Sequence, residues 1–95
     1  MPERIDHFIV NRWMTKYMDI KGIELCVFAI IYTYPDNAIT YRDFANLIGC
    51  KLRTVQRAIE ILEEKNYITR KKQTDVWKPY IYSINYDYIK SNARR

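Results

Sequence analysis

Apolar positions recur at helical spacing in the middle of the chain. Nearly every residue from Ile23 to Tyr34 is apolar, which is typical of a central helix packed on several sides. Pro35 ends this helix, because the residue before a proline is pushed out of the α region. The run is too short to cross a bilayer and contains Glu24, so it predicts a core helix and no membrane span.

Two further helices are expected between residues 40 and 65. The inward face of the first consists of Phe44, Ala45, Leu47 and Ile48. The stripe of the second, over residues 51–65, consists of Leu52, Val55, Ile59 and Leu62, with Ala58 allowing close packing.

The boundaries of these helices also have sequence signals. Thr40 is a good N-cap, and Asp43 three residues later allows a reciprocal capping box. Gly49 permits the left-handed conformation of a sharp turn between the two helices, and Asn66 is a plausible left-handed stop. The segment therefore predicts two helices folded around a tight turn.

After residue 66 the apolar period changes to that of strands. YITRKK and WKPYIYSI are rich in β-formers, with the polar QTDV between them. Tyr80, Tyr82 and Ile84 share one face, so a hairpin with one side on the core is expected. Ala38 and Ile39 are expected to form a minimal strand.

The two ends of the chain are expected to add short elements. Near the start, residues 8–10 form a β-prone run, and Asn11 could cap a helix over about residues 12–18. Phe8, Trp13, Met14 and Tyr17 are more apolar side chains than such a core needs, which motivates the hypothesis of a homodimer through this N-terminal segment. Near the end, residues 85–95 predict one more short helix that frays after residue 92.

Two helices joined by a tight turn and followed by a hairpin define a winged helix-turn-helix. The expected fold class is mainly α with a small β-hairpin: a three-helix core plus a wing, with an extra N-terminal segment. Ninety-five residues fit a single domain. Its parts are an N-terminal extension (1–21), a helical core (22–66), the wing (67–85) and a C-terminal tail (86–95).

The formal net charge of +5 is unevenly distributed. Nine basic and five acidic residues lie between residues 40 and 78, a surplus of four. The acidic residues crowd the end of the second helix, and the basic ones crowd its start and the hairpin. A polyanionic partner, double-stranded DNA above all, suits this pattern.

The start of the second helix carries side chains suited to phosphates and base edges. The candidate DNA-binding residues of this recognition helix are Lys51, Arg53, Thr54, Gln56 and Arg57. Arg can fork onto guanine and Gln onto adenine, whereas Thr can reach a phosphate or a base methyl. The alternative for each is an ordinary solvated side chain.

A second candidate set would bind the DNA backbone from the wing and its surroundings. It consists of Arg42, Arg70, Lys71, Lys72 and Lys78. Cations there gain by counterion release whatever the sequence, although lysines on an edge strand also discourage aggregation. Trp77 would cover the base of the wing, or stack on sugar or base. The nine tyrosines suit strand and core positions better than stacking on single strands.

Other chemistry has weak support in the sequence. Cys26 and Cys50 lie in apolar helical patterns and are expected to be buried free thiols in a reducing cytoplasm. Lone His7 has no partner at metal spacing, so no metal site is expected. No carboxylate pair, nucleophile–base set or phosphate loop is present. An enzyme, a catalytic residue or a cofactor is therefore not expected.

LIGCKLRTVQRAIEILEEKNYI, with FIVNRWM and IKGIELCVFAIIYTY upstream, resembles the N-terminal winged-helix domain of phage and mobile-element replisome organisers, which is similar to that of DnaD-type primosomal initiators. Two departures are Lys51, where relatives usually carry Ser or Thr, and Leu52, which would contact DNA or pack on the preceding helix. Such organisers are normally longer, so the chain is an isolated domain or acts by DNA binding alone.

The resemblance implies a role in replication initiation, with replication proteins as further partners. The alternatives are a small bacterial transcriptional regulator that meets transcription proteins, and a winged helix that binds another protein instead of DNA. The target sequence and the oligomeric state do not follow from the sequence.

Overall fold

The computed structural model describes residues 7–75 and 78–93. Its helices are α1 (Arg12–Tyr17), α2 (Ile23–Thr33), α3 (Tyr41–Ile48), α4 (Leu52–Glu64) and α5 (Tyr86–Ala93). Its strands are β1 (Asn37–Ala38), β2 (Ile68–Lys71) and β3 (Ile81–Ile84). The expected class, a mainly α winged helix with a small sheet, is confirmed.

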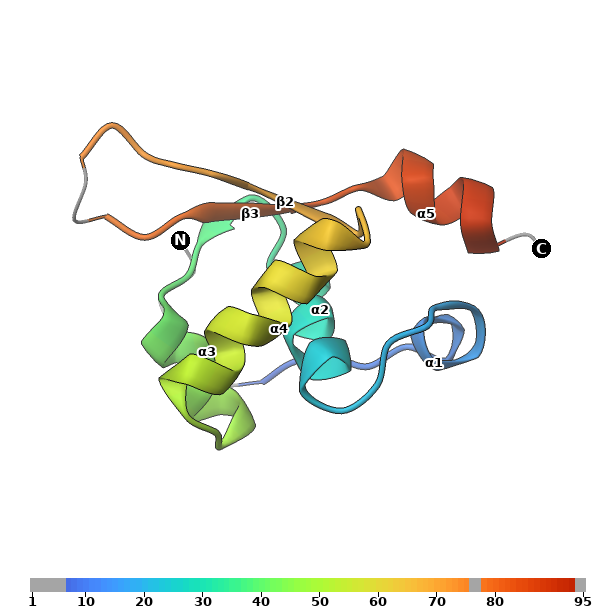
Figure 1. Ribbon diagram of the computed structural model, residues 1–95, viewed down its shortest axis with the longest axis horizontal. Helices are drawn as coiled ribbons and strands as arrows, with labels where there is room; N and C mark the ends of the chain where they lie inside the picture. Colours follow the sequence, from blue (N-terminus) through green and yellow to red (C-terminus); the bar gives the residue numbers. More distant parts are fainter. Residues whose placement is uncertain (1–6, 76–77, 94–95) are drawn as a thin grey trace.

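The three strands form one antiparallel sheet in the order β1-β3-β2. In the hairpin Ile68 faces Ile84 and Lys71 faces Ile81, and on the other side of β3 Ala38 faces Ile81. Figure 1 shows the hairpin as a long arm above the helices, with α5 continuing from β3 at the opposite end of the molecule. The ordered strands are shorter than the β-forming sequence around them, since Lys72 and Tyr80 lie outside both.

The core forms where α2 crosses beneath α4 and the sheet. Phe28, Ile30 and Ile31 of α2 are fully buried. They lie among Val55, Ile59 and Leu62 of α4 and Tyr82 of β3, as the apolar stripe of α4 predicts. The rings of Phe44 and Tyr82 meet edge to face at 5.4 Å, which fastens α3 to the sheet.

The predicted helix boundaries in the helix-turn-helix are confirmed at atomic level. The Asp43 N–H donates to Thr40 Oγ1 at 3.0 Å and the Thr40 N–H donates to Asp43 Oδ2 at 3.2 Å, a complete capping box. Gly49 (φ 82°) and Asn66 (φ 63°) both adopt the left-handed conformation. These residues fix where α3 ends and where the hairpin begins.

The N-terminal segment corrects several expectations. Residues 8–10 form no strand, and the Ile9 N–H donates to the Thr33 side chain on α2. Asn11 stands at the N-cap of α1, but its side chain makes no capping hydrogen bond. Met14 is fully buried, and the Trp13 ring packs edge to face on Phe28 at 6.0 Å. Much of the apolar surplus thus belongs to the core of this chain.

Three side chains assigned to the interior are more exposed than expected. Cys26 and Cys50 are half-buried free cysteines. Leu52 is 44% exposed, although it lies on the same face of the helix as fully buried Val55. It is the first residue of α4 and forms the exposed end of the apolar stripe.

Candidate nucleic-acid interface

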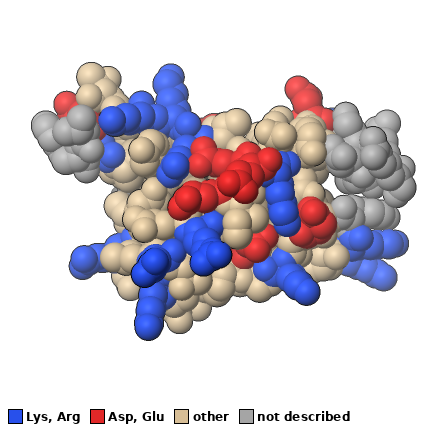
Figure 2. Space-filling model, viewed as in Figure 1, with Lys and Arg blue, Asp and Glu red and all other residues tan. Residues whose placement is uncertain are grey.

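The exposed face of α4 is divided by charge. Lys51, Arg53, Thr54, Gln56 and Arg57 are all exposed at its start, and Glu60 and Glu64 are exposed toward its end. In Figure 2 acidic side chains gather in the middle of the view, over the C-terminal half of α4, with Lys and Arg below and to the left, over its beginning and α3. The predicted recognition residues therefore share one accessible surface.

The cations of this surface have no carboxylate partner within the described part of the chain. Lys51, Arg53 and Arg57 form no ion pair with any residue in the described part of the chain, and neither does Arg42 on α3. By contrast, Lys65 at the end of α4 lies 3.5 Å from Glu24 and 3.6 Å from Asp19. Among the residues that the structure describes, the α4 cations without a carboxylate partner therefore lie in the first half of the helix.

The backbone of α4 adds to this potential. Its N-cap is Lys51, which makes no side-chain capping bond, and its first turn holds no acidic residue. Free N–H groups and the positive end of the helix dipole therefore coincide with the cationic side chains. An anion at this helix end would meet both.

Two grooves flank the start of α4. One, of about 490 Å³, lies against α3 and is lined by Arg42, Ala45, Asn46, Cys50, Lys51 and Leu52. The other, of about 300 Å³, lies against α2, and its lining includes Thr54 and Arg57. Candidate DNA-binding side chains therefore lie in both grooves beside α4 and on its exposed face.

The wing cations divide into free and bound ones. Lys71 and Lys72 are exposed and have no ion pair among the described residues. Lys78 is also exposed, but lies 3.3 Å from the Asp75 carboxylate. The Gln73 side chain donates to the Pro79 carbonyl at 2.8 Å, which joins the two arms of the wing. Trp77, expected at the wing base, lies outside the described residues.

Arg70 points into the protein. Its Nε lies 2.9 Å from Glu63 Oε1 of α4, its Nη1 donates to the Tyr41 hydroxyl of α3 at 2.9 Å, and its guanidinium lies 4.6 Å from the Tyr80 ring centre. Burial works to lower the pKa of Arg70, but Glu63 and Tyr41 outweigh it and raise that pKa overall. Arg70 thus braces the wing against both helices, a role that its place in a basic run did not signal.

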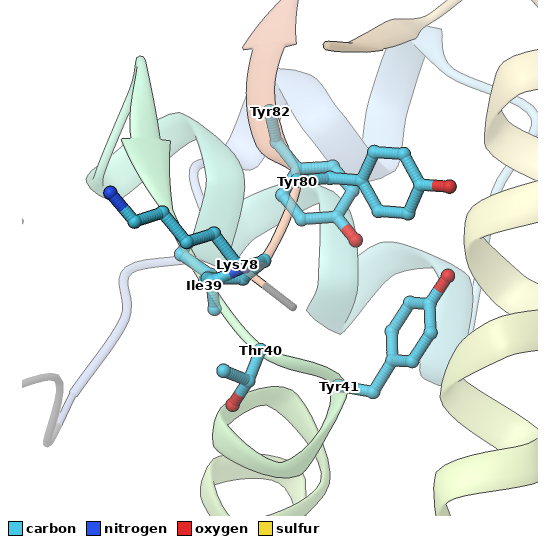
Figure 3. A pocket seen from close by; sticks show the side chains of 7 residues that line it. Ile39, Thr40, Tyr41, Lys78, Tyr80 and Tyr82 are labelled. Atoms are coloured by element: carbon cyan, nitrogen blue, oxygen red, sulfur yellow. The ribbon is translucent and has the colours of Figure 1, made fainter. Parts of the chain in front are cut away.

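A cavity of about 250 Å³ lies at the root of the wing. Figure 3 shows Tyr41, Tyr80 and Tyr82 around it, with Lys78 at its edge. Burial, together with Tyr41, raises the pKa of Tyr82 far above its ordinary value, so its hydroxyl stays neutral. The cavity lies between residues 78–82 of the wing and the N-terminus of α3.

Residues 7–75 and 78–93 show neither a metal-binding cluster nor a membrane-spanning helix. No group of three or more His, Cys, Asp or Glu side chains gathers there to hold a metal ion. His7 instead contacts Tyr34, whose hydroxyl donates to the His7 carbonyl at 2.9 Å. No described helix has the length and apolar character needed to span a membrane.

A buried three-helix core, a helix presented by a glycine turn and a basic wing together define the winged helix-turn-helix class of DNA-binding domains. The chain belongs to the helix-turn-helix domain family, whose model matches residues 19–68. This is a DNA-binding family without enzymatic activity, in agreement with the sequence.

One curated relative is Transcription factor E of Halobacterium salinarum, 25% identical over 93 residues. The alignment covers 95% of this chain and 51% of that protein, so the chain spans about half the length of the curated relative it matches.

Solved structures share the fold. One is a mutant MepR from a multidrug-resistant S. aureus clinical isolate, with a TM-score of 0.66 and 21% identity over 81% of this chain and 55% of that chain. Another is S. aureus MepR bound to ethidium bromide, with a TM-score of 0.62 and 20% identity over 82% and 61% of the two chains.

Proposed function

We propose that the protein binds duplex DNA as a small transcriptional regulator. The observation that carries this proposal is the set of exposed cations at the start of α4, Lys51, Arg53 and Arg57, which have no carboxylate partner among the described residues. In this arrangement the first turns of α4 enter the major groove. Arg53, Thr54, Gln56 and Arg57 face the base edges, and Lys51 and Arg42 meet phosphates.

The wing contributes in two distinct ways. Lys71 and Lys72 neutralise backbone phosphates from the arm of the hairpin. Arg70 holds that arm at a set distance from α4 through Glu63 and Tyr41 and is not itself a phosphate contact. Lys78 joins the phosphate contacts only by exchanging Asp75 for DNA.

Two observations bear on the choice between a role in transcription and a role in replication. The curated relative with 95% coverage of this chain is by name a transcription factor, which favours regulation of transcription. Replication initiation with phage-type partners rests on the sequence resemblance alone and is the second candidate. Selection of bound duplexes from a random pool, followed by mapping of occupied sites in cells, separates the two. Sites at promoters support the regulator, and sites confined to a replication origin support the initiator.

A salt titration tests DNA binding itself. Neutralising about three to six phosphates predicts that log K falls against log salt with a slope of roughly −3 to −5. A duplex affinity that is undetectable or insensitive to salt would instead favour a protein-binding winged helix. The same selected duplexes report on a homodimer, since paired half-sites about one helical turn apart require two copies. Sedimentation that shows only monomer at micromolar concentrations contradicts the dimer.

A further inference from the structure

Leu52 is an apolar side chain in a cationic setting. It is 44% exposed, although the next three positions of its stripe, Val55, Ile59 and Leu62, are fully buried. It stands in the first turn of α4 on the lip of the groove of about 490 Å³ that Arg42 and Lys51 also line. Leu52 is therefore accessible to a ligand that binds in that groove.

The surroundings of Leu52 select among possible partners. Its neighbours Lys51, Arg53 and Arg42 are exposed cations without an ion pair among the described residues. An apolar protein surface would bury these charges unpaired, at a large cost. A polyanion can pair with these cations. If it also carries an apolar group within reach of Leu52, it can bury that side chain as well.

Duplex DNA has such a group on the floor of its major groove. The C5-methyl of thymine is the apolar feature that side chains contact there, and it distinguishes T from C. The N-terminal residues of a recognition helix are those that reach base edges.

We propose that Leu52 reads the C5-methyl group of a thymine while Arg42 and Lys51 hold the adjacent phosphates. This inference rests on the proposed DNA binding and adds a specificity determinant to it. Because the contact is apolar, it differs from the flanking ionic contacts in two ways. It depends on the base, and it is insensitive to salt.

Replacement of thymine by deoxyuridine isolates this contact, since the exchange removes one methyl group and keeps the base pair. Duplexes selected from a random pool by the full chain are resynthesised with each thymine replaced in turn. At one position the affinity of the wild-type protein should fall about fourfold, the factor expected when one methyl-sized apolar group is no longer buried. Leu52→Ala should bind the thymine and deoxyuridine duplexes equally.

Two matched variants distinguish Leu52 from its neighbours. Thr54 also carries a methyl group, and Thr54→Ser removes it while keeping the hydroxyl, so this variant should retain the preference for thymine. Leu52→Met keeps an apolar side chain of similar volume and should retain it too. Circular dichroism and the urea midpoint confirm that each variant is folded.

The failures of the two proposals look different. Loss of salt-dependent duplex binding in the wild-type protein removes DNA binding as a whole. Salt-dependent binding without a thymine in the selected site, or with equal affinity for every deoxyuridine duplex, overturns only the role of Leu52. A preference for thymine that survives in Leu52→Ala and disappears in Thr54→Ser assigns the methyl contact to Thr54 and overturns it equally.

Discussion

Arg70 Nε and Glu63 Oε1 lie 2.9 Å apart, so one ion pair connects the base of the wing to the recognition helix. The Tyr41 hydroxyl joins the same guanidinium from α3. The wing is therefore braced against both helices of the helix-turn-helix.

Breaking this brace should destabilise the fold. Glu63→Gln leaves the half-buried guanidinium without its counter-charge, and the midpoint of urea unfolding should correspond to a loss of about 1 kcal/mol, since the pair is partly screened by solvent. Asp75→Asn breaks the more exposed pair with Lys78 and serves as the control, with a change within about 0.5 kcal/mol. Equal losses in both variants would contradict the brace.

Arg57 should contribute to recognition of a specific site. Arg57→Ala is expected to cost about 1–3 kcal/mol of binding free energy on the selected duplex if Arg57 reads a base edge, measured by titration at fixed salt. Lys90→Ala removes one positive charge from α5, at the other end of the molecule, and should leave the affinity nearly unchanged. A loss shared equally across unrelated duplexes would make Arg57 a phosphate contact instead.

The wing lysines should act without regard to sequence. Lys71→Ala with Lys72→Ala should weaken all duplexes alike and flatten the slope of log K against log salt by about 2, because each phosphate contact contributes about 0.9 to that slope. Isothermal or fluorescence titration at four salt concentrations measures this slope. If the slope of the double variant matches the wild type, the wing does not touch the backbone.

Alkaline pH should destabilise the fold through Tyr67. Burial and the hydrogen bond to Asp19 raise the pKa of Tyr67 from its ordinary value of 10.0 to about 12. Between these values the unfolded chain loses the Tyr67 proton and the folded chain keeps it. The free energy of unfolding therefore decreases as pH rises through this window and is unaffected below it. Urea midpoints at pH 9 and pH 11 should differ less in Tyr67→Phe than in the wild type, whereas an identical pH dependence would exclude Tyr67.

The parts of the fold that local chemistry dictates could be predicted from the sequence. Thr40 with Asp43, Gly49 and Asn66 each carry a conformational preference that hardly depends on distant residues, and each was placed correctly. The buried positions Val55, Ile59 and Leu62 followed from helical period.

Contacts between residues distant in the sequence could not be predicted from it. Arg70 sits in a run of three cations, and nothing local indicates that Glu63 and Tyr41 would hold it while Lys71 and Lys72 stay free. The sequence likewise does not show that Trp13 packs on Phe28 of α2, or that Met14 is fully buried in the same core. The contribution of the predicted DNA contacts stays a prediction until binding is measured.

The charge order along α4 has a consequence for the design of variants. Cations at its beginning and carboxylates toward its end oppose the helix dipole, so each costs a few tenths of a kcal/mol of helix stability. A conventional thermostabilising redesign would place Ser or Asp at position 51 and gain rigidity. The same change would remove one of the cations that attract a polyanion to this surface, while Arg42, Arg53 and Arg57 remain. Stability and affinity are therefore traded against each other at one helix end, and selection for heat resistance alone should erode binding first.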